Sequence, residues 1–161
     1  MRRGIDTNVL VYAHIPTLPD HPPVREFLLR TLKSPEDVLV VTPLVLHEFV
    51  HVVTDERRFR PPVSMPEAIA TARLYLGRSN VECISCDESS MVKALELLES
   101  FGLGRKRIAD ALFAATLLTH GVSELITCNV ADFKVLSELT LCDPRLPLNA
   151  GPTGTKVAGG T

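Results

Sequence analysis

The chain has 161 residues and a mass of 17.6 kDa, the size of one ordinary domain. Hydrophobic residues make up 45% of it and charged residues 22%, so it can bury a full core. Lys and Arg number 17 against 19 Asp and Glu, and the resulting charge of −2 excludes a protein that coats nucleic acid by bulk positive charge. Aromatic residues reach only 5%, which argues against a stacking platform for bases.

The sequence carries no sign of export or of membrane insertion. Its early apolar stretch, residues 9–13, is too short for the core of a signal peptide. No apolar run approaches the roughly 18 residues that span a membrane. The cysteines are Cys83, Cys86, Cys128 and Cys142. Their spacing suits neither a disulfide framework nor a zinc site, so we expect small core residues in a cytoplasmic protein.

Short apolar runs typical of strands alternate with longer segments of helical period. In chain order, strands are predicted at 4–5, 38–41, 81–84, 125–127 and 141–142. Helices are predicted at 9–13, 24–32, 43–53, 68–76, from Asp87 or Ser89 to 101, 107–120 and 133–136. Helix-start signals support two of them, Thr42-Pro43 and the capping-box pattern Ser64-x-x-Glu67. This alternation predicts an α/β fold with a central, mainly parallel sheet that helices cover on both faces.

The composition changes near the C-terminus. From Pro147 onward Gly, Pro, Thr and Ala dominate. Such a segment has little to bury, so we expect one folded domain over residues 1–146 and a flexible tail over 147–161.

Four acidic residues fall near predicted strand ends or in early helix turns, where the active sites of parallel sheets lie. They are Asp6, Glu48, Asp110 and Asp132. Each one alone fits a helix cap or a solvated surface, but their neighbours are largely apolar, where an unpaired acid is costly. Like charges held close together require a compensating proton or cation. Hard divalent cations prefer oxygen ligands, so the sequence predicts a Mg²⁺ or Mn²⁺ site.

The segments that carry these acids resemble, in order and spacing, the four motifs of PIN-domain ribonucleases. They read DTNVLVYA at 6–13, TPLVLHEF at 42–49, IADALFAAT at 108–116 and TCNVADF at 127–133. The resemblance extends from residue 1 to about residue 142, and the compact size is similar to that of VapC toxins of type II toxin–antitoxin systems. It implies a three-layer α/β/α PIN-like fold.

The resemblance further implies a metal-dependent endoribonuclease. The acidic positions that hold one or two Mg²⁺ or Mn²⁺ ions match Asp6, Glu48, Asp110 and Asp132. The polar positions that orient these acids or contact the scissile phosphate match Thr7, Asn8, Thr127 and Asn129. Asn129 stands where some relatives have an acid. In this mechanism water on the metal attacks phosphorus in line, a second cation about 4 Å away stabilises the leaving oxygen, and the products carry 3′-hydroxyl and 5′-phosphate ends.

Positive charge for an RNA substrate is available next to one of these acids. Arg105, Lys106 and Arg107 lead into the predicted helix of Asp110, whose N-terminus adds a preference for anions. We therefore expect these three residues to contact phosphate. The resemblance also implies a cognate antitoxin and a homodimer, with residues 61–76 as a candidate dimer surface.

Two other functions remain open at this point. His47-Glu48-Phe49-Val50-His51 matches HExxH, the zinc-protease helix in which two His bind zinc and Glu acts as the base. That interpretation leaves Asp6, Asp110 and Asp132 unexplained. The other alternative is a non-catalytic interaction module with the same PIN fold, against which the presence of all four acids argues.

Overall fold

The computed structural model describes residues 1–146, and the predicted flexible tail at 147–161 lies outside the described residues. Five strands form one sheet in the order β3-β2-β1-β4-β5. The strands are β1 (Arg2–Ile5), β2 (Val38–Val41), β3 (Val81–Cys83), β4 (Glu124–Ile126) and β5 (Thr140–Cys142). All four strand pairs are parallel, which confirms the predicted parallel sheet.

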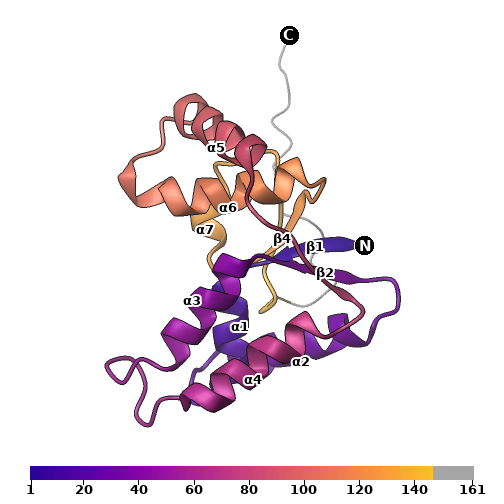
Figure 1. The fold of residues 1–161 in the computed structure, drawn as a ribbon, viewed down its shortest axis with the longest axis vertical. Helices are drawn as coiled ribbons and strands as arrows, with labels where there is room; N and C mark the ends of the chain where they lie inside the picture. The colour runs from indigo at the N-terminus through magenta and orange to yellow at the C-terminus, as the bar shows by residue number, and fades with distance from the viewer. Residues whose placement is uncertain (147–161) are drawn as a thin grey trace.

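Helices cover both faces of this sheet. They are α1 (Thr7–His14), α2 (His21–Lys33), α3 (Pro43–Val53), α4 (Met65–Leu76), α5 (Glu88–Ser100), α6 (Ile108–Thr119) and α7 (Val130–Phe133), with a 3-10 turn η1 (Arg105–Arg107) ahead of α6. Figure 1 shows α5 and α6 on one face and α2 and α4 on the other. The predicted three-layer α/β/α fold is confirmed. No helix in the described part of the chain is long and apolar enough to cross a membrane.

The predicted helix starts are confirmed in their atomic detail. Thr42 caps α3, because its Oγ1 accepts a hydrogen bond from the Val45 amide at 3.2 Å. Ser64 and Glu67 form the full capping box of α4. At α5 the cap is Asp87, which accepts from the Ser90 amide at 2.8 Å. These contacts are local in sequence, and for that reason they could be predicted.

Some predicted element boundaries are wrong. Helix α2 begins at His21, three residues before the predicted start, because prolines fit the first turn of a helix, where their missing N–H is not needed. The predicted helix at 107–120 begins instead with the tighter turn η1. The predicted helix at 133–136 lies at Val130–Phe133, directly after Asn129.

The prediction that the cysteines are core residues is wrong for two of them. Cys83 and Cys86 are exposed, because β3 is an edge strand and the chain beyond it runs along the surface. Cys128 and Cys142 are half-buried, and all four thiols are free.

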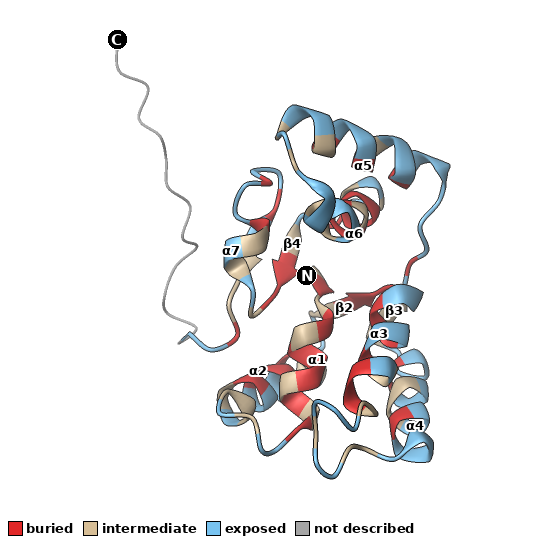
Figure 2. Cartoon of the chain, turned by 90° about the vertical axis from the view of Figure 1, so that its left-hand side faces the viewer, coloured by how far each residue is buried: buried red, intermediate tan, exposed pale blue. Residues whose placement is uncertain are grey.

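The core is built around the central strand β1. The fully buried residues of the sheet are Ile5, Leu39, Val40, Val41, Leu125 and Ile126 (Figure 2). Helix α6 packs onto β1 at Gly4, where a Cβ atom would lie only 2.5 Å from the Leu117 side chain. Glycine therefore permits the close approach that holds α6, and with it Asp110, next to the end of β1.

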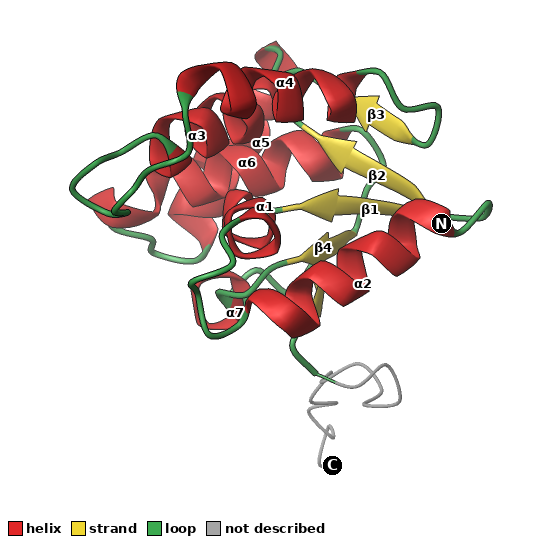
Figure 3. Cartoon of the chain, turned by 90° about the horizontal axis from the view of Figure 1, so that it is seen from below, coloured by secondary structure: helices red, strands yellow, loops and turns green. Residues whose placement is uncertain are grey.

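The carboxyl ends of the strands meet at one edge of the sheet (Figure 3). Asp6 follows β1, Thr127 follows β4 and Asp143 follows β5. The Asp6 amide donates to the Ile126 carbonyl at 3.0 Å, and the Thr127 amide donates to the Cys142 carbonyl at 3.0 Å. The chain leaves β1 toward β2 on one side and continues at β4 on the other, so Asp6 lies at a switch point of the sheet, where ligands bind in such folds.

Candidate active site

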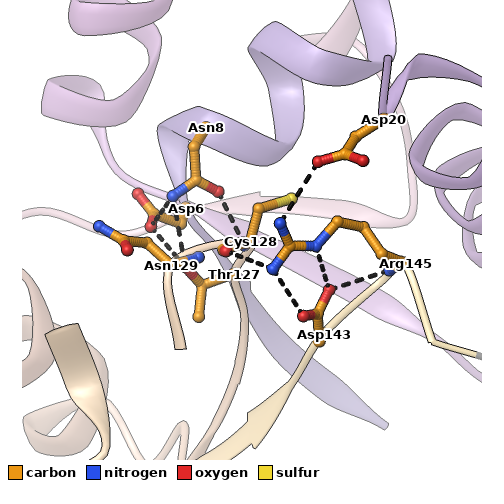
Figure 4. Close-up of polar contacts among 8 residues, drawn as sticks. All are labelled: Asp6, Asn8, Asp20, Thr127, Cys128, Asn129, Asp143 and Arg145. Carbon is orange, nitrogen blue, oxygen red and sulfur yellow. Dashed lines mark hydrogen bonds and ion pairs between the residues drawn. The ribbon is translucent and has the colours of Figure 1, made fainter. Parts of the chain in front are cut away.

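Asp6 is held by one side chain from the following helix α1 and by one from the distant loop after β4. Thr127 Oγ1 donates to Asp6 Oδ2 at 2.7 Å, and Asn8 Nδ2 donates to the same oxygen at 2.6 Å (Figure 4). Asn8 also accepts a hydrogen bond from the Cys128 amide at 3.0 Å. The Asn129 amide donates to Thr127 Oγ1 at 2.9 Å. The first and last predicted motifs therefore form one hydrogen-bonded unit around Asp6.

The electrostatic setting of Asp6 is unfavourable for its charge. Burial raises the pKa of Asp6 from 3.8 to about 6, although hydrogen bonds from Thr127 and Thr7 lower it. The carboxylates of Glu48 and Asp110 raise this pKa further by repulsion. Asp6, Glu48 and Asp110 therefore lie close enough for their negative charges to repel one another.

A single hydrogen bond, donated by Thr7 of α1, links Glu48 to the end of β1. Glu48 lies in the middle of α3 as an exposed residue, although its neighbours in the sequence are largely apolar. The buried Thr7 donates from Oγ1 to Glu48 Oε2 at 2.8 Å. This contact brings Glu48 to the same sheet edge as Asp6, because Thr7 directly follows Asp6.

Asp110 and Asp132 share one guanidinium group. Arg107 Nη1 lies 3.1 Å from Asp110 Oδ2 and 2.6 Å from Asp132 Oδ1. Burial raises the pKa of Asp110, and Asp132 and Glu48 contribute to the increase, while Arg107 opposes it. Asn129 Nδ2 donates to Asp132 Oδ2. All four acids thus lie at one edge of the sheet. Asp6 and Glu48 are held by Thr127 and Thr7, whereas Asp110 and Asp132 are bridged by Arg107.

The two other predicted cations remain at the surface. Arg105 and Lys106 are exposed in η1, at the start of α6, and neither forms an ion pair with any residue of the described chain. They therefore remain available to an anionic ligand, whereas Arg107 is engaged with Asp110 and Asp132.

The side chains around Asp6 suit a hard divalent cation by their chemistry. All candidate ligands are oxygens, and Asp6, Glu48 and Asp110 repel one another, a cost that a bound cation would remove. Within residues 1–146, no three His, Cys, Asp or Glu side chains form a group able to hold a metal ion as they stand. The acids would therefore have to draw closer around a cation.

A family model described as the PIN domain matches residues 5–139. The chain belongs to the PIN-domain family. Over 142 residues it is 28% identical to Ribonuclease VapC24 of Mycobacterium tuberculosis, covering 88% of this chain and 95% of that protein. Its fold is similar to that of VapBC2 from Rickettsia felis, bound to a promoter DNA fragment, with a TM-score of 0.62 and 23% identity over 88% of this chain and 97% of that one. A toxin–antitoxin complex from Klebsiella pneumoniae gives a TM-score of 0.57 at 18% identity over 88% and 97% of the two chains.

The HExxH segment of this PIN domain does not have the surroundings of a zinc site. His47 and His51 are exposed on α3. Glu48 is bound by Thr7. No third ligand completes a metal-holding group with them in the part of the chain that the structure describes. The named relative is a ribonuclease, so the protease alternative is not favoured.

Sequence reasoning missed a half-buried histidine, His14. His14 on α1 lines a groove of about 210 Å³ between α2 and α4. Its Nε2 lies 2.9 Å from the Tyr75 hydroxyl, and its ring packs edge-on against Phe49. Burial lowers the pKa of His14 to about 4, so it is neutral at physiological pH. The sequence signals none of these contacts, because they join residues far apart in the chain.

Sequence reasoning also missed Arg145, which lies beyond the part of the PIN domain that the family model matches. Its guanidinium group contacts the loop that carries Thr127 and Asn129, through the Cys128 carbonyl at 2.7 Å. No predicted motif includes this residue.

The raised pKa of Asp6 makes a testable prediction for stability. Between pH 3.8 and about 6 the folded chain binds more protons at Asp6 than the unfolded chain does. The contribution of Asp6 to stability is therefore greatest below pH 3.8 and is lost as the pH rises through about 6. At about 1.4 kcal/mol for each pKa unit, the cost at neutral pH approaches 3 kcal/mol at most.

Asp6→Asn is accordingly expected to raise the melting temperature by several degrees at pH 7.5 in EDTA, and to raise it less at pH 4. Thermal unfolding followed by circular dichroism at the two pH values measures this. Equal melting temperatures of wild type and variant at both pH values would contradict the electrostatic cost assigned to Asp6.

Proposed function

We propose that this PIN domain is a Mg²⁺- or Mn²⁺-dependent endoribonuclease and the toxin of a type II toxin–antitoxin system. The observation that carries the proposal is the convergence of Asp6, Glu48, Asp110 and Asp132 at one sheet edge, with Asp6 at the switch point. The relative Ribonuclease VapC24 supports the same reaction class. Location in the cytoplasm is part of the proposal.

The four acids would hold the cation, with Asp6 and Asp110 as the most direct ligands. When bound, such a cation lowers the pKa of water and stabilises negative charge on the phosphate and the leaving oxygen. Asn8 and Thr127 both donate to Asp6 Oδ2, which favours its ionised form and fixes its orientation. Thr7 orients Glu48 in the same way.

The RNA backbone would approach over the start of α6. Arg105 and Lys106 lie there on η1, and the exposed first turn of a helix attracts phosphate. Asn129 orients Asp132 and completes the polar rim of the site. Because Arg105 and Lys106 supply positive charge beside the acids of a chain whose net charge is −2, we expect binding that depends on local contacts.

Mapping of RNA ends tests the proposal. Purified protein with Mg²⁺ or Mn²⁺ is expected to leave 3′-hydroxyl and 5′-phosphate ends, and Asp110→Asn is expected to leave the RNA intact. Adapter ligation that depends on a 5′-phosphate, followed by sequencing, distinguishes these ends from 2′,3′-cyclic phosphates. Cyclic phosphate ends would contradict the metal-assisted mechanism.

A toxic nuclease requires restraint, so we include a cognate antitoxin and a homodimer in the proposal. The toxin–antitoxin complex from Klebsiella pneumoniae has a similar fold, which supports a protein partner. A short reading frame directly upstream of the gene would support a dedicated antitoxin, and purification of the chain together with its product would test binding.

A further inference from the structure

Arg145 joins three segments that lie far apart in the sequence. Its Nε and Nη2 donate side-on to the Asp143 carboxylate at 2.8 and 2.7 Å. Nη2 also donates to the Cys128 carbonyl at 2.7 Å, and Nη1 donates to Asp20, between α1 and α2, at 3.3 Å. Figure 4 shows the guanidinium group at the centre of these contacts. An isolated surface ion pair contributes little to folding stability. One planar guanidinium group that binds three segments, however, fixes their relative positions.

The backbone of Cys128 connects the Arg145 guanidinium group to the acids. Its amide donates to Asn8 Oδ1 at 3.0 Å, and its carbonyl accepts from Arg145. The residue before it, Thr127, donates to Asp6, and the residue after it, Asn129, donates to Asp132. Any movement of this peptide therefore shifts the donors of two predicted acids at once.

The Arg145–Asp143 pair is well suited to hold this peptide. Burial by itself would raise the pKa of Asp143, but the hydrogen bonds from Arg145 lower it below its ordinary value, so the carboxylate stays ionised. Asp143 directly follows β5, whose Cys142 carbonyl accepts from the Thr127 amide at 3.0 Å. The Arg145–Asp143 ion pair is therefore anchored directly at the end of strand β5.

We propose that Arg145 is a positioning residue of the active site, which holds the Cys128 carbonyl so that Thr127 and Asn129 present Asp6 and Asp132 in their working orientation. The inference rests on the proposed nuclease function. Arg145 contacts none of the four acids among the described residues, so its effect on them would be exerted through the loop.

The test compares Arg145→Met with the matched control Arg30→Met. Arg30 is exposed on α2 and pairs only with Glu26, one turn away, within the described chain. Amide hydrogen exchange at Cys128 and Asn129 is expected to accelerate about tenfold in Arg145→Met, the effect of losing one charge-assisted hydrogen bond. The kcat for RNA cleavage is expected to fall about 10- to 100-fold with KM within about twofold, as for other supports of metal ligands. Arg30→Met is expected to match wild type in both measurements.

Asp143→Asn provides a second route if Arg145→Met folds poorly. It removes the side-on pair but preserves the size of the side chain, so the same local exchange and the same fall in kcat are expected. The double variant is expected to be no worse than either single variant, because both changes release the same peptide.

Several outcomes would overturn the inference. They are unchanged exchange at Cys128 and Asn129, faster exchange with an unchanged kcat, additive losses in the double variant, and faster exchange throughout the molecule. If wild-type protein cleaves no RNA, the proposed function fails, and the exchange measurement still decides whether Arg145 holds the loop.

Discussion

Replacing Asp6 by Asn is expected to lower the rate of RNA cleavage by about 1000-fold or more while the protein stays folded. A loss of this size corresponds to about 4 kcal/mol of transition-state stabilisation. The side chain of Asn has nearly the same volume and can still accept the hydrogen bond from Thr127, so the change removes the charge and little else. Asp6 lies at the switch point and is repelled by both Glu48 and Asp110, so its charge is central to the cluster.

The measurement is steady-state cleavage of a defined RNA, with circular dichroism to verify folding. Glu26→Gln is a matched control, because it removes one exposed negative charge on α2, where Glu26 pairs only with Arg30 in the described chain. Undiminished cleavage or growth toxicity of a folded Asp6→Asn protein would favour a non-catalytic interaction module with the PIN fold.

Removal of divalent cations is expected to abolish cleavage completely. The acids at the sheet edge offer only oxygen ligands, and among the described residues no His side chain forms a hydrogen bond with any of them. Excess EDTA should stop the reaction, and Mg²⁺ or Mn²⁺ added above the chelator should restore it.

Two controls make the metal experiment specific. In wild-type protein, added Mg²⁺ should raise the melting temperature, because it offsets the repulsion among Asp6, Glu48 and Asp110. Asp6→Asn should respond less. Cleavage that resists EDTA would contradict the proposal, and tightly bound zinc with peptide cleavage that depends on His47 would revive the HExxH alternative.

The features of the fold that could be predicted are those determined by short stretches of chain. Thr42, Ser64 and Asp87 cap α3, α4 and α5, as predicted. These caps could be predicted because each is a contact between residues three positions apart. The apolar run Val38–Val41 is a buried strand, as its continuous hydrophobicity indicated. Boundaries were harder to predict, as α7 and the start of α2 show, since neighbouring turns compete for the same residues.

The candidate site was predictable in its composition and less so in its arrangement. Their places near strand ends and in early helix turns, together with the resemblance, selected the acids, and the parallel sheet brings them to one edge. The sequence could not reveal that Glu48 is exposed and held by Thr7, or that Arg107 bridges Asp110 and Asp132. Such details depend on side-chain directions of helices that pack from different parts of the chain.

The sequence by itself therefore determined the fold class, the PIN-domain family and the acids that define the candidate site, because hydrophobic period, caps and motif order are local or linear properties. Only the tertiary structure decided which charges meet. It raises the pKa of Asp6 by burial, engages Arg107 with two acids, exposes Cys83, and brings Arg145 to the Cys128 peptide from 17 residues further along the chain. The physical reason is that burial and charge pairing depend on distances through space, which are settled only when the helices pack on the sheet.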